Sequence, residues 1–589
     1  MLNIHLNAFG SLVSCRSSLP LLVHKRVDLC SFNKKPRRFL SAHNNSTLLQ
    51  ATLSYAVHRR SSDDHPTNWD HDFIQSIQSP YADGEFRKRI EELKIKVKHF
   101  FSASDVPTVE LELIDKISRL GLAYYFSEEI GNLLARMQKE GRESLHGLNE
   151  TALCFRLLRQ HGYNVSSDVF NKFRDSKGFM NCLAQDAKGL LSLYEAAHLG
   201  FPEENILDEA KEFSVKHLKE MLTREDDDSN LAELIKQSLE APLHHLMPRI
   251  VARDYIVLYE KEERKISCLL ELAKLDFNVS QALYQSEVKE VSRWWQKVGL
   301  TKKVQLFRDH LFESYLWANQ IASEPKFSKF RKVLTKFAMI SCILDDFYDR
   351  YGSPEEVRLF TSAIRRWDLK AMETLPDYLK LLYFILYNYA NETIYDILKN
   401  FGWEATRFIK AEWIHICEAA LKEAEWSRRG DIPSLEKYLE NDLVSGGLTV
   451  PVHIYYFIEE NLTKDKLDWH NKGYQISYLS SLIVRLTDYL ALSQAETQEE
   501  KIYSSILCHM KDSGESYEKI KYVEDMLKIA WKCLNKESLN KEIPRNFVHA
   551  SMNSARVVST MFRKGDGCGR TTGITEEWIK SLYIEPIPL

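Results

Sequence analysis

Apolar residues recur every three or four positions along almost the whole chain from about Ile90 onward. One example begins at Leu111, and another lies in GLLSLYEAAHLG, from Gly189 to Gly200. This period places apolar side chains on one face of an α-helix, whereas alternation typical of strands is scarce. Turn signals such as Gly352-Ser353-Pro354 divide the pattern into helices of ordinary length. The sequence therefore predicts an all-α fold.

The chain of 589 residues is too long for a single hydrophobic core, so we expect more than one helical domain. No repeat of solenoid period occurs, and no long Pro/Ser linker marks a boundary. A weak break in the helical pattern near Ser286 to Lys297 is the best candidate for a domain boundary. We predict a leader over residues 1–58, an N-terminal helical domain over 59–285 and a C-terminal helical domain over 286–589.

The first 60 residues differ in composition from the rest. They hold one acidic residue, Asp28, against many serines and a set of basic residues: Arg16, Lys25, Arg26, Lys34, Lys35, Arg37, Arg38, Arg59 and Arg60. An Arg- and Ser-rich segment that is poor in acids is typical of an organelle transit peptide. The alternative is a disordered basic tail.

Charge, hydropathy and cysteine spacing exclude several classes of protein. The net charge of −4 leaves no basic surplus for nucleic acid, and no run of about 18 apolar residues predicts a membrane span. Among the ten cysteines there is no CxxC pair, which argues against zinc ribbons and thioredoxin-like chemistry. We expect reduced thiols in a reducing compartment.

The stretch ILDDFYDR, from Ile343 to Arg350, places three acids after a strongly apolar run. Asp345 and Asp349 are four residues apart and so share a helix face, while Asp346 lies about 100° away. Gly352 is expected to end this helix. Carboxylates at a helix C-terminus repel one another and oppose the macrodipole, so a divalent cation is their natural partner. The alternative is a solvated acidic helix end.

The segment DDFYD resembles the DDxxD motif of class I terpene synthases. Arg59-Arg60, eight residues and Trp69 are similar to the RR(x)8W element of plant monoterpene synthases. Further similar segments follow in family order, among them KGLLSLYEAAHLG, SRWWQKVGL and the terminal EPIPL. The resemblance extends over essentially all of the chain after the leader.

The resemblance implies two α-helical domains with the active site in the C-terminal one. Three Mg²⁺ or Mn²⁺ ions would hold the diphosphate of a prenyl substrate between two metal motifs. Asp345 and Asp349 would be ligands from the first motif, with Asp346 beside them. The ions would act as Lewis acids on the leaving diphosphate.

The second metal motif of the family matches RLTDYLALSQAE, from Arg485 to Glu496. Asp488 and Glu496 occupy its outer ligand positions, but Leu492 stands where the family has a Ser or Thr. Tyr489 replaces the usual second acid. Water can fill the position of the missing hydroxyl, because Mg²⁺ habitually retains waters, so we expect weakened binding of that ion.

The resemblance also implies groups that bind the diphosphate and the carbocation. Arg485 and Arg308 match diphosphate-binding arginines, and Lys511 is a weaker match. Trp317 occupies a family position for cation stabilisation, with Tyr315 and Phe347 as further candidates, although any of these aromatics can be plain core.

Two departures reduce positive charge near the diphosphate: His310 replaces the second arginine of the RxR element, and Glu499-Glu500-Lys501 replaces the usual RGD. No DxDD stretch supports chemistry initiated by protonation. His244 and His245 are adjacent and diverge on a helix, which favours a structural role over metal binding.

We therefore predict a monomeric, chloroplast-targeted (plastid stroma) terpene synthase that converts geranyl diphosphate to monoterpene. Two alternatives stay open. One is a sesquiterpene synthase that uses farnesyl diphosphate. The other is a catalytically impaired paralogue that binds prenyl diphosphate, which the changes at Leu492 and His310 motivate. The product depends on cavity shape, which many dispersed positions determine.

Overall fold

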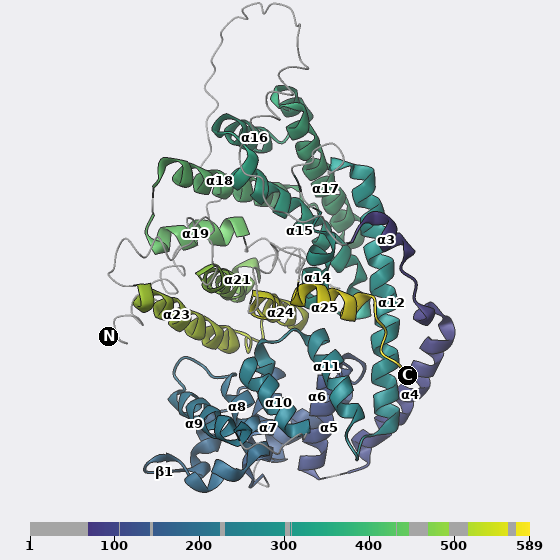
Figure 1. Ribbon diagram of the computed structural model, residues 1–589, viewed down its shortest axis with the longest axis vertical. Helices are drawn as coiled ribbons and strands as arrows, with labels where there is room; N and C mark the ends of the chain where they lie inside the picture. The colour runs from purple at the N-terminus through teal and green to yellow at the C-terminus, as the bar shows by residue number, and fades with distance from the viewer. Residues whose placement is uncertain are drawn as a thin grey trace, which may run out of the picture. The chain divides into compact units, whose positions relative to one another are not determined.

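The predicted all-α fold is confirmed (Figure 1). The computed structural model describes residues 69–104, 106–141, 145–223, 230–300, 307, 309–431, 433–446, 469–493, 516–562 and 573–589. Within these ranges the one sheet is a short antiparallel hairpin of β1 (Arg174–Asp175) and β2 (Gly178–Phe179).

The first α-helices of the described chain are α3 (His71–Ser76), α4 (Gly84–Lys98), α5 (Pro107–Arg119), α6 (Ser127–Arg136), α7 (Leu148–Gln160), α8 (Ala187–Ala197), α9 (Asn205–Leu222), α10 (Asn230–Glu240) and α11 (Pro248–Glu260). They are followed by α12 (Ser267–Val298), α14 (Leu311–Ile321), α15 (Ser328–Asp346), α16 (Pro354–Arg366), α17 (Asp377–Phe401), α18 (Thr406–Arg429), α19 (Leu435–Gly446), α21 (Trp469–Ser493), α23 (Ser516–Glu537), α24 (Arg545–Met561) and α25 (Ile574–Tyr583). Short helical turns include η7 (Leu243–His245) and the π-helical η9 (Phe347–Tyr351).

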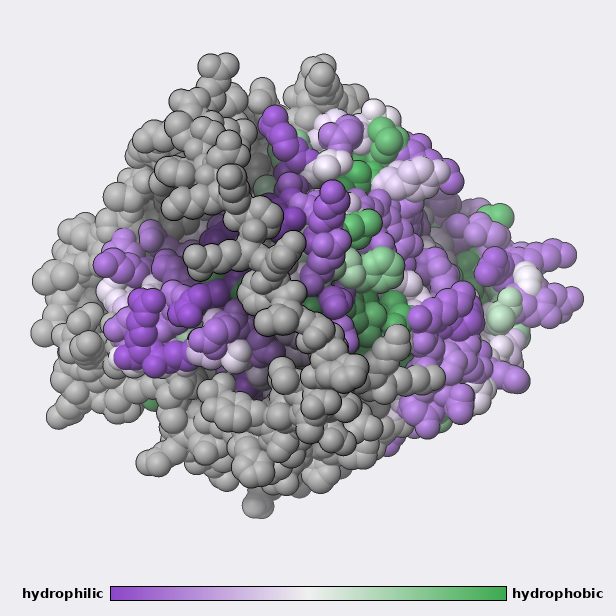
Figure 2. Space-filling view, turned by 90° about the horizontal axis from the view of Figure 1, so that it is seen from above, coloured by the Kyte–Doolittle hydropathy of each residue, from purple (hydrophilic) through white to green (hydrophobic). Residues whose placement is uncertain are grey.

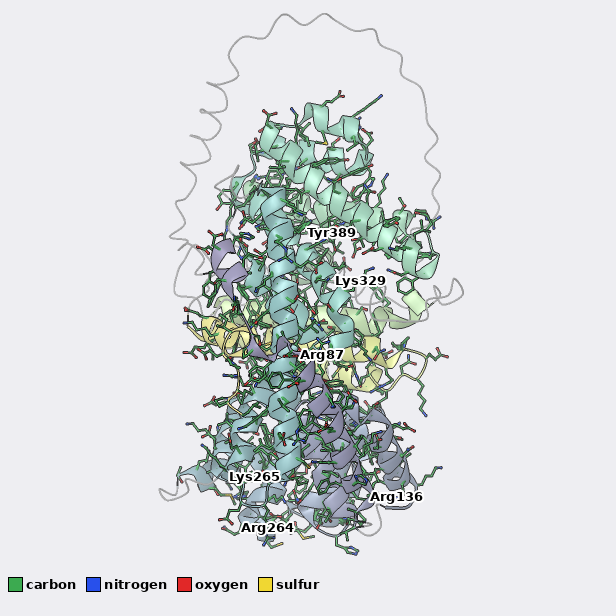
Figure 3. All side chains as sticks on the ribbon, turned by 90° about the vertical axis from the view of Figure 1, so that its right-hand side faces the viewer. Arg87, Arg136, Arg264, Lys265, Lys329 and Tyr389 are labelled. Carbon is green, nitrogen blue, oxygen red and sulfur yellow. The ribbon has the colours of Figure 1, made fainter. Side chains whose placement is uncertain are left out.

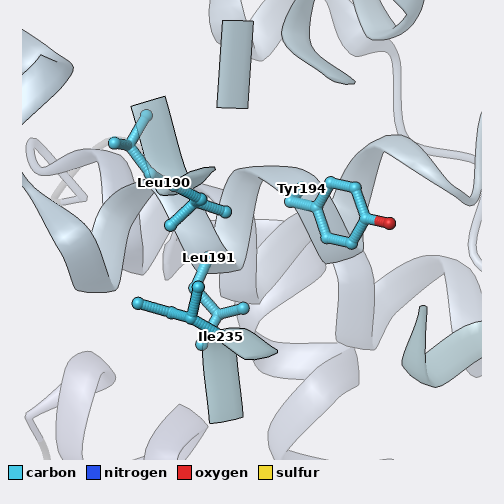
Figure 4. Close-up of a cluster of buried hydrophobic side chains, with 5 residues drawn as sticks. Leu190, Leu191, Tyr194 and Ile235 are labelled. Carbon is cyan, nitrogen blue, oxygen red and sulfur yellow. The ribbon is translucent and has the colours of Figure 1, made fainter. Parts of the chain in front are cut away.

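The apolar period read from the sequence corresponds to buried helix faces in the N-terminal region. Leu190, Leu191 and Tyr194 of α8 pack with Leu218 of α9 and Ile235 of α10 (Figure 4). Leu190 and Leu218 are fully shielded from solvent. Burying one such side chain contributes about 1.5–3 kcal/mol, so this cluster alone accounts for the close packing of the three helices.

Helix α12 runs without interruption from Ser267 to Val298 and ends at Gly299, whose φ of 67° is the left-handed conformation that favours glycine. It packs against α3, α4, α14, α15 and α25, and so contacts elements from both ends of the chain. The boundary predicted at residues 285/286 falls inside this continuous helix. The domain limits therefore stay a prediction that no break in secondary structure marks.

The C-terminal tail is fastened to α12 by three carboxamide side chains on one helix face. Asn278 donates to the carbonyl of Ile587 and accepts from its N–H, both at 2.8 Å. Gln281 donates to Glu585 O at 3.1 Å, and Gln285 donates to Tyr583 O at 2.8 Å. Since a tail without secondary structure must find partners for its backbone groups elsewhere, these residues fix its path.

Helix α15, which carries the acid motif, is held from three sides. Buried Arg331 pairs with Glu287 of α12 at 2.6 Å. Tyr389 of α17, labelled in Figure 3, donates to the carbonyl of Val333 at 3.2 Å. Phe337 packs on Trp413 of α18 with ring centres 5.1 Å apart. These contacts give the acids at the end of α15 a rigid support.

Hydrophilic side chains cover most of the described surface on the face shown in Figure 2, with smaller hydrophobic areas between them. The large apolar residues that remain exposed are spread along the chain, among them Ile95, Val109, Leu369 and Tyr395. Across the described ranges, no helix combines the length and hydropathy needed to cross a bilayer, in agreement with the sequence.

Candidate active site

The acid motif lies where α15 changes into a π-helical turn. Asp345 and Asp346 are the last residues of the α-helix, and Asp349 belongs to η9. The N–H of Gly352 donates to Phe347 O at 2.7 Å, which closes the wider turn. The expectation of one α-helix continuing to Gly352 is therefore wrong in its last turn. Such π turns occur most often at functional sites.

Tight packing at Gly352 explains this ending. A Cβ at this position would lie 2.7 Å from the Phe347 ring and from Val357, and 2.8 Å from Phe347 O. The next helix, α16, begins at Pro354. Ser353 accepts from Glu356 N at 3.2 Å, and Glu356 in turn accepts from Ser353 N at 2.9 Å, which forms a capping box.

Asp345 and Asp349 combine solvent contact with unfavourable electrostatics. Both side chains are exposed. Nevertheless, the surrounding protein raises the pKa of Asp345, against the opposing effect of Arg485 and Arg350. The pKa of Asp349 lies well above its usual value, first because of desolvation and then because of Asp345 and Glu423. Both carboxylates are therefore accessible groups in an environment with too little positive charge.

The other charges of the motif are partly balanced. Half-buried Asp346 lies 3.4 Å from exposed Arg350, one helical turn further on, in an i,i+4 pair. Pairs of this kind contribute little to stability. Arg350 therefore moderates the local negative charge but does not neutralise the whole motif.

The second motif contributes Arg485, Asp488 and Tyr489 from α21. Arg485 forms a two-point contact with Asp442 of α19: Nε donates to Oδ2 and the second nitrogen lies against Oδ1, both at 2.7 Å. The Tyr489 hydroxyl also donates to Oδ2 of Asp442. Asp488 is 3.5 Å from Arg485. Helices α19 and α21 pack side by side (Figure 1).

The structure brings the two motifs within electrostatic range. Arg485 lowers the pKa of Asp345, and Asp442 raises it, although the direct effect of burial is larger than either. Charges that interact in this way face a common region. The C-terminal end of α15 and the middle of α21 are therefore near enough for their charges to influence one another.

Asp442 is a residue that the sequence reasoning missed. It is only 2% exposed, and it shares its helix with buried Leu439 and Leu443. The signal was present in YLENDLVS, because an acid three residues after Leu439 falls on the apolar face of the helix. A charged residue on a buried face needs a partner, and this one binds the arginine of the second motif.

Several predicted site residues lie outside the part of the chain that the structure describes. These are Arg308, Glu496, Lys511, the Glu499–Lys501 segment, the Arg59-Arg60 pair and the side chain of Leu492. Next to Arg308, His310 is buried and Asp309 accepts from Leu311 N at 3.0 Å. Burial raises the pKa of Asp309 to about 6.

The three aromatic candidates have different surroundings. Trp317 is half-buried, and its ring lies edge to face with Phe562, with ring centres 6.4 Å apart. Its Nε1 has no hydrogen-bond partner among the described residues. By contrast, Tyr315 is fully buried and donates to Glu287 at 2.7 Å, and Phe347 packs against Phe360. Tyr315 and Phe347 are therefore core residues, whereas Trp317 remains a candidate for stabilising the carbocation.

Trp69, the last residue of the RR(x)8W element, is buried beside α14. Its ring is 5.4 Å from that of Phe312, which in turn stacks on Tyr583 at 6.2 Å. On the neighbouring α12, Ser292 hydrogen-bonds to His71 at 2.7 Å. Trp69 and His71 are thus anchored against the C-terminal region.

The structural interpretation of the adjacent histidines is confirmed. His244 is buried and shares a 2.7 Å hydrogen bond with Asn535. His245 stacks on Trp531 with ring centres 4.0 Å apart. Burial lowers the pKa of His244 to about 3, so its ring is neutral at physiological pH. Both rings serve packing.

The chemistry of the acid motif fits hard divalent cations. Asp345 and Asp349 are accessible oxygen donors whose charges repel each other, which a bound cation would relieve. No three His, Cys, Asp or Glu side chains converge as a metal site within the described ranges, which leave out Glu496. Any ion held here would need further oxygens, and water or diphosphate supplies such ligands.

Comparison with known proteins identifies the family of this chain. The terpene synthase N-terminal domain matches residues 68–239, and the metal-binding domain of the terpene synthase family matches 296–533. A trans-ocimene synthase from Litsea cubeba, described as chloroplastic, is 43% identical over 90% of this chain and 92% of its own.

Two solved structures are also similar. Isoprene synthase from grey poplar (Populus x canescens), in complex with three Mg²⁺ ions and dimethylallyl-S-thiolodiphosphate, is 36% identical with a TM-score of 0.81, over 89% of this chain and 99% of its own. Limonene synthase with 2-fluorolinalyl diphosphate is 33% identical with a TM-score of 0.85, over 90% and 100%. On this evidence, the chain belongs to the terpene synthase family.

Proposed function

We propose that this protein ionises geranyl diphosphate and converts the resulting cation to monoterpene, with release of diphosphate. As a member of the terpene synthase family, it is a metal-dependent lyase that acts on a prenyl diphosphate. The observation that carries the proposal is the pair of accessible, mutually repelling carboxylates of Asp345 and Asp349, at the end of α15 and in the adjoining η9.

Acidic and basic side chains have different roles in binding the diphosphate: the acids hold metal ions, and the basic groups contact the diphosphate. Asp345, Asp349, Asp488 and Glu496 hold the metal ions, and Asp346 supports them from the adjacent position. Mg²⁺ or Mn²⁺ supplies Lewis-acid activation of the leaving group, as the three Mg²⁺ ions of the isoprene synthase complex suggest. Leu492 leaves one ligand position to water, which weakens binding at the second motif.

Three cationic side chains orient the leaving diphosphate. Arg485 presents a planar guanidinium, whose geometry suits phosphate oxygens, while Arg308 and Lys511 add positive charge to the same region. Orientation of the leaving group brings the allylic carbon–oxygen bond into line for heterolysis. His310 adds charge only when protonated.

Trp317 stabilises the carbocation through the face of its indole ring. An aromatic face attracts a cation without offering a nucleophile that would trap it. Trp317 lies on α14, the helix that also carries Phe312 of the Trp69–Phe312 contact. The N-terminal segment beyond Trp69 excludes water from the site, as the family resemblance implies.

Geranyl diphosphate is favoured over farnesyl diphosphate by the leader and by the relatives. The basic, serine-rich residues 1–58 fit a plastid transit peptide, and the trans-ocimene synthase is chloroplastic. The mature protein acts in the plastid stroma. We propose that it acts as a monomer. Residues 59–285 form the supporting domain and residues 286–589 the catalytic one.

The test uses protein that lacks residues 1–58, incubated with geranyl or farnesyl diphosphate and either Mg²⁺ or Mn²⁺. Gas chromatography of the volatiles should detect monoterpenes from geranyl diphosphate. Product from farnesyl diphosphate alone would replace the proposal by a sesquiterpene synthase. Binding of either diphosphate without any product would identify a catalytically impaired paralogue.

A further inference from the structure

The most strongly held charge in the candidate site is Asp442, which no motif includes. Its Oδ2 accepts from Nε of Arg485 at 2.7 Å and from the hydroxyl of Tyr489, and its Oδ1 forms an ion pair with a second nitrogen of Arg485 at 2.7 Å. A buried carboxylate is costly unless it has such partners. Three donors on one acid are therefore an arrangement that fixes both the acid and its partners.

The contact fixes the guanidinium of Arg485 in particular. Two of its nitrogens are committed to Asp442, so the plane of the group cannot rotate without breaking both contacts. The nitrogen that contacts Oδ1 is also 3.5 Å from Asp488. The orientation of Arg485 is thus set by Asp442 on the neighbouring helix and by Asp488 on its own.

Tyr489 occupies the position at which the second metal motif usually has an acid. In this chain its hydroxyl reaches an acid on the neighbouring helix instead. Its ring is buried and packs 5.9 Å from that of Tyr438 on α19, so the hydroxyl is held in one direction. A carboxylate is therefore still present near this position, but it comes from α19 rather than α21.

We propose that Asp442 and Tyr489 are positioning residues that fix Arg485 for the diphosphate of the substrate. In this arrangement Asp442 replaces the carboxylate that the motif usually has at position 489. The inference rests on the proposed function, because it assigns the diphosphate to Arg485. Neither residue touches the reacting atoms. Their effect on the substrate passes through the orientation and charge of one guanidinium.

The first test is Tyr489→Phe in the full chain, which removes one hydroxyl and keeps the ring. Inorganic diphosphate with Mg²⁺ is the probe, and its dissociation constant is measured by calorimetry. We expect that constant and the KM for geranyl diphosphate to rise about tenfold, with a smaller change in kcat. The control Tyr474→Phe, on the same helix, should leave both constants unchanged.

The second test moves the carboxylate of Asp442 on α19 to position 489 on α21. Tyr489→Asp alone places two acids side by side and should weaken diphosphate binding by about 100-fold. Adding Asp442→Ala removes the repulsion and returns the acid to α21, so binding should recover to within about threefold of the wild type. A purely structural role of Asp442 predicts further loss in the double variant. Thermal unfolding of each variant distinguishes loss of folding from a changed orientation of Arg485.

Diphosphate binding keeps this inference separate from the proposed function. If the wild type forms no terpene but binds diphosphate, and Tyr489→Phe weakens that binding, the positioning role holds while the proposed reaction fails. Wild-type affinity for diphosphate in folded Tyr489→Phe overturns the inference. So does a folded double variant that binds no better than Tyr489→Asp.

Discussion

The two ends of α15 carry charged residues in opposite electrostatic situations. Near the start of the helix, Arg331 and Glu287 form a fully buried pair at 2.6 Å, and Tyr315 adds a hydrogen bond to Glu287. At its end, Asp345 and Asp349 are exposed, and their neighbours include further acids. The first group is complete within the protein, whereas the second has excess negative charge.

This difference separates structural charges from functional ones. Although burial alone would lower it, the pKa of Arg331 is raised by its hydrogen bonds with Glu287, so the pair is stable as ions. The raised pKa values at Asp345 and Asp349 have the opposite meaning, because ionisation is unfavourable there without an added cation. The charges of the helix are thus paired at one end and left in excess at the other.

The largest expected effect is a loss of stability on breaking the buried ion pair of Arg331 and Glu287. Arg331→Met leaves Glu287 buried without its cation, which should lower the free energy of unfolding by about 3–5 kcal/mol. Urea denaturation followed by circular dichroism measures this loss. The double variant Glu287→Gln/Arg331→Met removes both charges and should be more stable than the single one. Equal stability of the two would argue that packing, not charge, holds this end.

Asp345→Ala should have the second largest effect, and on catalysis rather than on folding. We expect terpene formation to fall at least about 100-fold, because a ligand for the activating ions is lost. The free energy of unfolding should stay the same or rise, since repulsion with Asp349 disappears. Asp525→Ala, an exposed acid of α23, is the control. Full activity of Asp345→Ala would remove the basis of the proposed function.

Most of the fold was legible in the sequence because burial repeats with the period of a helix. Leu190, Leu191 and Tyr194 were predicted to share a helix, and they form part of a core. The capping box at Ser353 and the packing role of His244 also followed from local rules. The domain boundary did not, because α12 continues through it and local sequence carries no sign of which helices it joins.

The site was predictable only where a motif held its residues close in sequence. Asp345 and Asp349 were found in this way, but the π turn that separates them depends on how Gly352 packs against Val357. Asp442 was missed because its partners are 43 and 47 residues away in the chain. Pairing across helices is a tertiary property, and an isolated acid in one helix does not reveal it.

The third prediction tests whether the π turn matters to the acids. Gly352→Ala adds a Cβ that would lie 2.8 Å from the backbone oxygen of Phe347, so the turn must shift. Overpacking of this kind costs about 1–3 kcal/mol. We expect a matching fall in stability together with a higher Mg²⁺ concentration for half-maximal activity. Gly84→Ala, where no atom lies within 4 Å of the added carbon and the backbone is not left-handed, controls for the loss of a glycine in general. An unchanged Mg²⁺ requirement in Gly352→Ala would separate the turn from the metal site.

The smallest effect concerns Asp254 of α11, an exposed acid that tests whether a raised pKa is enough to mark a functional group. Burial of its surroundings raises the pKa to about 6, from an ordinary value of 3.8. Below about pH 4 the group is protonated in both states, and its contribution to stability is fully present. As the pH rises toward 6 the unfolded chain loses this proton first, so the native state loses stability.

Asp254→Asn should therefore stabilise the protein at pH 8 by roughly 1 kcal/mol, a value reduced from the full shift because the side chain is exposed. The gain should disappear at pH 4, and terpene formation should not change. Asp525→Asn, whose carboxylate contacts Lys528 at 3.1 Å, should show no such gain at pH 8. If Asp254→Asn instead abolished activity, a raised pKa would suffice to identify functional acids in this chain. The two ends of α15 would then differ in function because of the raised pKa values at one end, and not because several acids cluster there.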